Sequence, residues 1–230
     1  MGKKYKIKMK SIFISGASGA LGLAVSEFFC LNGFRVTGTY SSEKPKQVFP
    51  NFTWVNWKTN DLGLTEDLVS YLISVPSFDA WFHLSGGFWG GTSFENAPSD
   101  KTRQMMEMNF QSAWELAPVI IPALTEKNHT PILFVGAEAG LAPNPGYGAY
   151  GVSKAALHYF SQTLAEELRG RNITVNTIIP STLDTTGNRT SMPDVDFNKW
   201  IKTEEFISVL EFLMSEKSRS VTGSVIRLSK

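Results

Sequence analysis

Short apolar runs alternate with helical patterns along most of this chain. The runs are rich in β-branched and aromatic residues, which is typical of strands buried on both faces of a sheet. The predicted strands are residues 10–15, 34–40, 51–57, 78–84, 132–135, 173–179 and 223–228. Helices are predicted at residues 23–31 and 61–73, at two stretches within 99–127, from residue 150 to 168, and at 203–215. This alternation predicts an α/β fold with a doubly wound parallel sheet of about seven strands and helices on both faces.

The composition is that of one ordinary globular domain. The 230 residues are 42% hydrophobic and 19% charged. No linker, internal repeat or low-complexity segment divides them, so residues 1–230 are predicted to form a single domain. The formal net charge of +1 creates no overall field that would attract nucleic acid or an anionic membrane. Lysines crowd the start of the chain, and we interpret residues 1–9 as a frayed, solvated terminus.

Signals for targeting, disulfides and metals are missing from the sequence. No apolar run reaches about 18 residues and none precedes a cleavage site, so we expect no membrane span and no secretory signal. Cys30 is the only cysteine, which excludes a disulfide within the chain and leaves no thiolate set for a metal. His83, His129 and His158 have no ligand spacing. We therefore expect a cytoplasmic protein without a metal site.

A glycine-rich turn joins the first predicted strand to the first predicted helix. Its spacing is G-x-x-G-x-x-G. Glycines let the backbone approach a pyrophosphate, and the N-terminus of the next helix offers N–H groups and the positive end of its dipole. The strand–turn–helix context favours a dinucleotide site over a turn without a ligand. The residues predicted to hold the dinucleotide here are Gly16, Ser18, Gly19, Ala20, Leu21 and Gly22.

The end of the second strand normally decides between the two nicotinamide dinucleotides. An acidic residue there bonds the adenosine ribose and repels a 2′-phosphate, whereas a basic residue attracts the phosphate. Here the position is Tyr40, followed by Ser41 and Ser42, with Lys44 close behind. We predict contacts from Tyr40 and Ser41 to the dinucleotide. Neither charge rule is met, so the choice between NADH and NADPH stays open.

A second glycine cluster follows the fourth strand. Its small residues Ser85, Gly86 and Gly87 let a flat ligand pass over the end of that strand, and we predict that they contact the dinucleotide. Phe88 and Trp89 come next. They either stack on an aromatic substrate, at roughly 1–3 kcal/mol by analogy with base–aromatic stacking, or pack within the loop. Since doubly wound sheets bind ligands at the carboxyl ends of their strands, the two glycine clusters and the loop after the fifth strand are expected to converge on one cleft.

Tyr150 and Lys154 begin the helix that follows the fifth strand. At i and i+4 their side chains share one helix face. A phenol beside an ammonium has its charged form stabilised, so we expect the pKa of Tyr150 to fall toward working pH. Asn109 lies amid apolar residues and needs a hydrogen-bond partner if it is buried. Because Y-x-x-x-K is common in ordinary helices, a role in proton transfer depends on the rest of the chain.

Together these motifs resemble those of the short-chain dehydrogenase/reductase family over nearly the whole chain. The shared features are the turn Gly16 to Gly22, Asn109, Tyr150-x-x-x-Lys154, and Asn176-x-x-x-Pro180 with Thr185. The resemblance implies a Rossmann-type fold that binds NAD or NADP. In that family the Tyr donates or relays a proton, the Lys lowers its pKa and holds the nicotinamide ribose, and the Asn organises a water chain. The loop after the sixth strand holds the carboxamide. The residues given that last role are Pro180, Thr182 and Leu183.

Two departures from the family pattern concern the substrate. Most members have a Ser thirteen residues before the Tyr, where this chain has Ala137. An alanine cannot donate a hydrogen bond to a developing alkoxide, and losing such a donor typically costs on the order of 10²–10³ in rate. The usual Asn-Asn-Ala-Gly after the fourth strand is replaced by Leu-Ser-Gly-Gly at residues 84–87. Either the enzyme is degenerate, or its substrate has no carbonyl that needs a donor.

Both departures resemble one branch of the family, the quinonoid dihydropteridine reductases. The matching runs are G-A-L-G at 19–22, G-G-x-x-G-G at 86–91, G-A at 136–137, P-x-T-L-D-T at 180–185 and N-R-x-S-M-P at 188–193. Members of that branch reduce quinonoid dihydropterin to tetrahydropterin with a nicotinamide dinucleotide, usually NADH, and act as dimers. An electron-poor C=N system needs less polarisation by a donor than a carbonyl does, which fits Ala137.

The resemblance therefore implies an NADH-dependent dihydropteridine reductase that regenerates tetrahydropterin such as tetrahydrobiopterin. It places Phe88, Trp89 and Ala137 at the pterin. NADPH use stays open, because Tyr40 replaces the Asp of the members that prefer NADH. The resemblance also implies a homodimer, in which the helix of Tyr150 and the helix before it pair into a four-helix bundle.

Two alternatives to this function stay open. The first is a carbonyl reductase that acts on another small substrate, and Ala137 argues against it. The second is a non-catalytic sensor that binds the dinucleotide. The joint presence of Tyr150, Lys154 and Asn109 argues against a sensor, because binding alone needs no proton relay.

Overall fold

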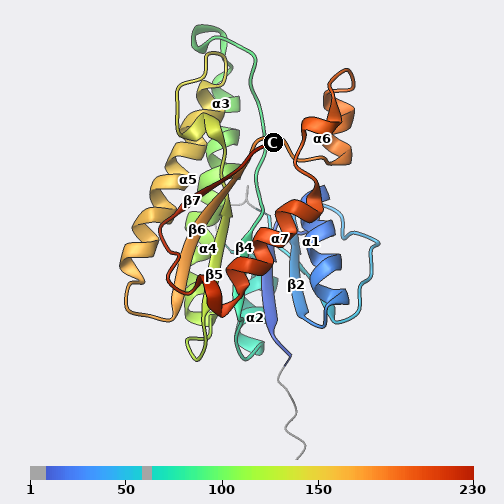
Figure 1. Cartoon of the computed structure of the whole chain (residues 1–230), viewed down its shortest axis with the longest axis vertical. Helices are drawn as coiled ribbons and strands as arrows, with labels where there is room; N and C mark the ends of the chain where they lie inside the picture. Colours follow the sequence, from blue (N-terminus) through green and yellow to red (C-terminus); the bar gives the residue numbers. More distant parts are fainter. Residues whose placement is uncertain (1–8, 59–63) are drawn as a thin grey trace, which may run out of the picture.

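A parallel sheet lies between two layers of helices in the computed structural model, which describes residues 9–58 and 64–230 (Figure 1). The strand order is β3-β2-β1-β4-β5-β6-β7. The strands are β1 (Ser11–Ser15), β2 (Arg35–Tyr40), β3 (Phe52–Asn56), β4 (Ala80–His83), β5 (Thr130–Val135), β6 (Ile173–Pro180) and β7 (Val225–Leu228). Every adjacent pair runs parallel. The predicted doubly wound fold is confirmed.

The helices connect the strands as the hydrophobic pattern predicts. They are α1 (Ala20–Leu31), α2 (Glu66–Ser74), α3 (Ser99–Met106), α4 (Ser112–Ile120), α5 (Gly148–Glu167), α6 (Thr186–Ser191) and α7 (Thr203–Met214). The helix predicted at 61–73 begins later than expected, at Glu66, where the hydroxyl of Thr65 accepts a hydrogen bond from the backbone of Leu68. The predicted start of that helix, like nearly all of the basic terminus, lies outside the described residues.

Alternate residues of the central strands bury side chains on opposite faces of the sheet. In β1, Phe13 packs with α2, α4 and α5, whereas Ile12 and Ile14 pack with α1 and α7. All three are fully buried, because both faces are covered by helices, and this explains why the strand is apolar throughout.

The strand order reverses between β1 and β4. β1 pairs with β2 on one side and with β4 on the other, so the chain departs from these two neighbouring strands in opposite directions. In the register of this pair Ser15 lies opposite His83, at the carboxyl ends of both strands. A crevice forms at such a point because the two connections diverge, and this is where doubly wound folds bind their ligands.

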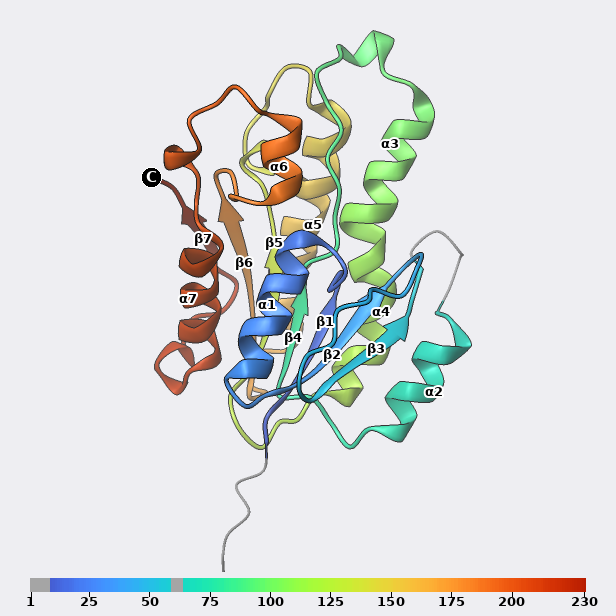
Figure 2. The same cartoon turned by 90° about the vertical axis from the view of Figure 1, so that its right-hand side faces the viewer.

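Two local features were not predicted. Residues Glu107–Gln111 form a π-helical turn, η2, between α3 and α4. The short helix α6 follows β6, and Figure 2 shows α3 and α6 rising beyond the carboxyl ends of the strands. Among the described residues, no helix combines the length and apolarity needed to cross a membrane.

Candidate active site

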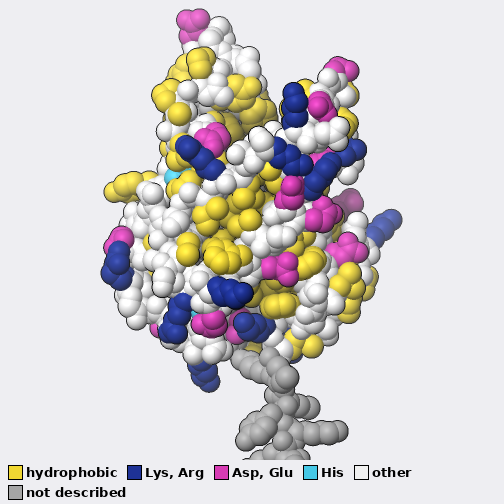
Figure 3. Space-filling view, in the orientation of Figure 1, with side chains coloured by type: hydrophobic (Ala, Val, Ile, Leu, Met, Phe, Trp, Pro, Cys, Tyr) yellow, Lys and Arg dark blue, Asp and Glu magenta, His cyan; other side chains and the backbone are white. Residues whose placement is uncertain are grey.

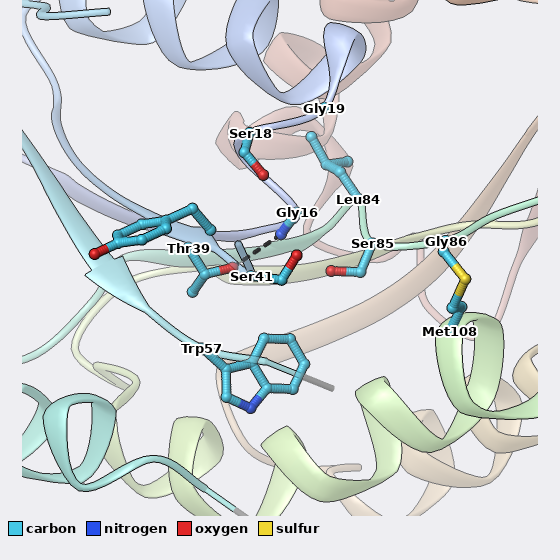
Figure 4. Close-up of a pocket in the computed structure, with 11 residues that line it drawn as sticks. Gly16, Ser18, Gly19, Thr39, Ser41, Trp57, Leu84, Ser85, Gly86 and Met108 are labelled. Carbon is cyan, nitrogen blue, oxygen red and sulfur yellow. Dashed lines mark hydrogen bonds between the residues drawn. The ribbon is translucent and has the colours of Figure 1, made fainter. Parts of the chain in front are cut away.

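The first glycine turn lies directly against the end of β4. Gly16 has a φ of +79°, and a Cβ on it would lie 2.5 Å from the backbone nitrogen of Ser85. A side chain at this position is therefore excluded both by the backbone conformation and by space. The backbone N–H of Gly16 donates to Oγ1 of Thr39, 3.0 Å away at the end of β2 (Figure 4). The turn is thus held between β2 and β4.

A cavity of about 200 Å³ opens beside this turn (Figure 4). Its lining residues are Gly16, Ser18, Gly19, Thr39, Tyr40, Ser41, Trp57, Leu84, Ser85, Gly86 and Met108. The structure thus brings together seven of the predicted dinucleotide residues, from Gly16, Ser18 and Gly19 through Tyr40 and Ser41 to Ser85 and Gly86. Ala20, Leu21, Gly22 and Gly87 do not line the cavity, and neither do Tyr150 and Lys154, which were predicted to hold the nicotinamide ribose. Thr39, Trp57, Leu84 and Met108 were not predicted.

The chemistry of this cavity fits a dinucleotide. Its polar groups are hydroxyls and backbone amides, which bond phosphate and ribose oxygens. Helix α1 begins at Ala20, immediately after the turn, so its N-terminal N–H groups lie at the same place. None of the described residues that line the cavity is acidic. The described part of the lining therefore presents no carboxylate that would repel an additional phosphate.

Asn109 joins the second glycine cluster to α5. The side chain is fully buried within the π-helical turn η2, a conformation that is frequent at functional sites. Its Oδ1 accepts from the backbone N–H of Gly87 at 2.8 Å, and its Nδ2 donates to the Gly87 carbonyl at 3.0 Å. Nδ2 also donates to Oγ of Ser153 at 3.0 Å, and that hydroxyl donates to the Tyr150 carbonyl at 2.7 Å. The predicted need for partners is thus met.

Lys154 is almost completely buried, with 4% of its surface exposed. Its Nζ donates to the carbonyl of Val135 at 2.8 Å, at the end of β5. Burial lowers the pKa of Lys154 to about 8. A Cβ on Gly86 would lie 3.2 Å from this ammonium and 2.8 Å from Oδ1 of Asn109. The second glycine cluster therefore passes directly over Lys154 and Asn109.

The expected fall in the pKa of Tyr150 is wrong for this structure. Burial raises the pKa of Tyr150 to about 12, because a phenolate loses its hydration there. The ammonium of Lys154 is bonded to the Val135 carbonyl and is itself disfavoured by burial. The attraction between this ammonium and a phenolate therefore does not compensate for the hydration that the phenolate would lose. Tyr150 remains a neutral hydrogen-bond donor at pH 7.

An aromatic cluster borders Tyr150. The Phe88 ring is 63% exposed, and it contacts the Tyr150 ring edge-on at a centroid distance of 5.1 Å. It also contacts the Tyr147 ring at 5.7 Å. Trp89 is half-buried in the same loop. Tyr147 was missed by the sequence analysis, although an aromatic residue three positions before Tyr150 was a visible signal.

Ala137 lies two residues after the end of β5 and is buried. Its backbone N–H donates to Nε2 of His158 on α5, at 3.3 Å. No sequence signal indicated His158, because it lacks any motif spacing. Pro180 is the last residue of β6, one residue beyond the predicted end of that strand, and Thr182 and Leu183 follow it. All three residues lie outside the lining of the dinucleotide cavity. The described residues contain no group of three or more His, Cys, Asp or Glu arranged to hold a metal ion.

An ion-pair cluster fixes α6 beside the site. The Asp184 carboxylate accepts hydrogen bonds from both Arg189 and Lys202, which hold its pKa well below the usual range. The guanidinium of Arg189 lies over the Phe197 ring at 4.7 Å. Figure 3 shows a notch between the projections formed by α3 and α6, above the ends of the strands.

Comparisons with known proteins agree with this geometry. Residues 10–196 match the family model described as short chain dehydrogenase. The dihydropteridine reductase of Dictyostelium discoideum is 31% identical over 224 residues, which cover 95% of this chain and 94% of the relative. The 3-oxoacyl-[acyl-carrier-protein] reductase FabG of Escherichia coli is 25% identical over 233 residues, 96% of each chain.

Solved structures share the fold. A putative short chain dehydrogenase from Escherichia coli CFT073, complexed with NADPH, superposes with a TM-score of 0.83 at 21% identity, over 95% of each chain. A short chain dehydrogenase from Salmonella enterica superposes with a TM-score of 0.82, also at 21% identity and over 95% of each chain. The sheet order, the glycine turn and the family match all lead to the same assignment. The chain belongs to the short-chain dehydrogenase family of NAD(P)-dependent oxidoreductases.

Proposed function

We propose that this protein reduces a quinonoid dihydropterin to a tetrahydropterin with a reduced nicotinamide dinucleotide. The observation that supports this most directly is Ala137. It occupies the position after β5 where most members of the family have a serine hydroxyl for the substrate carbonyl. A substrate without a carbonyl at its reacting centre has no use for that hydroxyl. The identity of 31% to a dihydropteridine reductase points to the same substrate class.

The reaction adds one hydride and one proton across a conjugated C=N system. The dinucleotide supplies the hydride when it is bound. Tyr150 is the proton donor, since its phenol is protonated at neutral pH, and burial raises its pKa further, to about 12. Lys154 holds the nicotinamide ribose, and Asn109 keeps the second glycine cluster in place through its two bonds to Gly87.

The exposed Phe88 ring gives the substrate a flat surface beside the proton donor. It lies 5.1 Å from the Tyr150 ring, centroid to centroid, and most of it faces solvent. A bicyclic heterocycle stacked on that ring would lie within reach of the phenol. Stacking of this kind contributes on the order of 1–3 kcal/mol. Trp89 and Ala137 complete the proposed pterin site.

A carbonyl reductase is the second candidate. The 3-oxoacyl-[acyl-carrier-protein] reductase of Escherichia coli matches 96% of this chain, and its name specifies a ketone substrate. The Tyr150 and Lys154 pair would serve such a substrate equally well, but Ala137 offers the ketone oxygen no side-chain donor. That loss typically costs on the order of 10²–10³ in rate.

Initial rates on quinonoid dihydropterin and on a 3-oxoacyl thioester, with the same enzyme preparation, distinguish the two candidates. We expect kcat/KM to favour the pterin, and Tyr150→Phe to abolish pterin turnover while leaving the Kd for NADH nearly unchanged. A preference for the thioester would transfer the assignment to the carbonyl reductase. Tight NADH binding without turnover of either substrate would indicate a sensor.

We propose NADH as the working dinucleotide, with NADPH also accepted. Tyr40 at the end of β2 supplies no charge, and none of the described residues lining the cavity is acidic. These residues therefore present no negative charge that would repel a 2′-phosphate. Parallel initial rates with NADH and NADPH test this, and a preference of more than about a hundredfold for either one would contradict it.

We also propose that the protein is a homodimer paired through α4 and α5. Three aromatic or apolar side chains on these helices face solvent: Trp114 is 57% exposed, Val152 55% and Tyr159 74%. Phe160 on α5 contacts the Trp114 ring at 5.4 Å, so the apolar surface is continuous across the two helices. Surface of this kind commonly marks a protein–protein interface.

A further inference from the structure

We propose that His158 is a positioning residue that holds the turn between β5 and α5, and with it Ala137, in place for the substrate. This inference rests on the proposed function of the site. His158 lies one helical turn beyond Lys154 on the same face of α5. The imidazole is 4% exposed, so it lies between the helix and the turn that follows β5.

The turn closes tightly around the imidazole. A Cβ on Gly136 would lie 2.2 Å from Nε2 of His158, and a Cβ on Gly140 would lie 2.8 Å from its Cε1. Real side chains do not approach so closely. The ring therefore fills space that both glycines leave free, and the path of residues 136–140 depends on the imidazole.

The hydrogen bond to Ala137 requires one form of this imidazole. The Ala137 N–H donates to Nε2, so Nε2 is unprotonated and the ring proton is on Nδ1. Burial and the nearby Lys154 charge lower the pKa of His158 to about 4, and the Gly140 backbone offsets only a part of this. Among the described residues, Nδ1 has no partner in full hydrogen-bonding geometry. The ring is therefore a neutral acceptor at physiological pH.

This arrangement separates the substrate side of the site from the dinucleotide side. The Gly136–Gly140 turn contributes no residue to the dinucleotide cavity, whereas Ala137 belongs to the proposed pterin site. Loss of the imidazole leaves the Ala137 N–H without its acceptor and opens a void beneath the turn. The pterin should then bind less well, while the dinucleotide should bind as before.

His129 offers a matched control. It is also 4% exposed, and its ring nitrogens are hydrogen-bonded to the Ser215 carbonyl and to Oγ1 of Thr174, whereas His158 is bonded through Nε2. It directly precedes β5, whereas Ala137 lies beyond the other end of that six-residue strand. A six-residue strand spans roughly 20 Å, so His129→Leu should cost comparable stability without affecting the site.

The test compares His158→Leu, His158→Gln and His129→Leu in the full-length protein. We expect His158→Leu to raise KM for quinonoid dihydropterin at least fivefold with the Kd for NADH within twofold of wild type. His158→Gln, whose amide oxygen can accept from Ala137, should restore most of the loss, and His129→Leu should leave KM unchanged. Equal effects of the two leucine variants on KM, or a parallel loss of NADH affinity, would overturn the proposal.

Two further measurements keep the test decisive. If His158→Leu does not fold, Gly136→Ala should produce the same increase in KM, because its methyl group enters the space of Nε2. If wild type does not reduce the pterin, the proposed function fails, but backbone hydrogen exchange still tests the positioning role. Residues 136–140 should exchange faster in His158→Leu than in His129→Leu, and equal protection would refute the role of His158.

Discussion

Replacing Lys154 by Met should stabilise the folded protein while abolishing turnover. Burial lowers the pKa of this ammonium from 10.5 to about 8. A base whose pKa is lower in the folded than in the unfolded state destabilises the fold at every pH at which the unfolded chain keeps that base protonated. At about 1.4 kcal/mol for each pKa unit, the difference corresponds to about 3 kcal/mol. This destabilisation is complete below pH 8 and disappears as the pH rises from 8 to 10.5.

The net gain should be smaller than that figure. The Val135 carbonyl loses its donor in Lys154→Met, which costs about 1 kcal/mol. The variant should therefore gain about 2 kcal/mol at pH 7, or roughly 4–8 °C in Tm for a chain of this size. Turnover should be lost, because the proposed site has no other cation for the nicotinamide ribose.

Thermal unfolding followed by circular dichroism at pH 7 and at pH 10.5 measures this effect. The difference in Tm between Lys154→Met and wild type should shrink toward zero or below at the higher pH. Lys127→Met, which changes an exposed lysine, should behave like wild type at both values. A variant that is less stable than wild type at pH 7, or a difference that does not depend on pH, would refute the reasoning.

Three other substitutions test separate parts of the site and surface. Ala137→Ser should raise kcat/KM for a 3-oxoacyl thioester at least tenfold by adding a donor for the ketone oxygen. Steady-state kinetics without such a rise would contradict the proposal that Ala137 decides between pterin and ketone substrates. Tyr40→Asp should lower the NADPH/NADH ratio of kcat/KM at least tenfold through charge repulsion, and an unchanged ratio would place the 2′-phosphate elsewhere. Trp114→Glu should convert the dimer to monomer in sedimentation velocity, whereas Val69→Glu on α2 should not; a wild-type monomer would end that proposal.

The strands were predictable because a strand that is buried on both faces of the sheet is apolar at consecutive positions. Ile12, Phe13 and Ile14 are all apolar since each faces a layer of helices. Helix α6 offered no such pattern, because none of its six residues is buried and none has a large apolar side chain. It depends instead on the hydroxyl of Thr185 as a cap and on the ion pairs of Asp184, one of which reaches Lys202. Pairing between residues so far apart leaves no periodic signal.

The site was predictable where short motifs fix the chemistry and unpredictable where the fold decides. Gly16, Asn109 and Lys154 were identified by their spacing and context. The pKa of Tyr150 was not, because it depends on how deeply the phenol is buried. Trp57 lies just after β3 and His158 lies within α5, and only the folded arrangement brings them to the site.

The π-helical turn at Glu107–Gln111 sets the angular phase between α3 and α4. A π turn holds one residue more than an α-helical turn of the same rise, so α3 is rotated relative to the position that a continuous α-helix would give it. If the same five residues wound as a regular α-helix, everything on α3 would turn by about 100° relative to α4. Met105 would swing out of its buried position, and Asn109 would lose Gly87 and Ser153. The π-helical turn therefore keeps the side chains of both helices on the faces that they occupy.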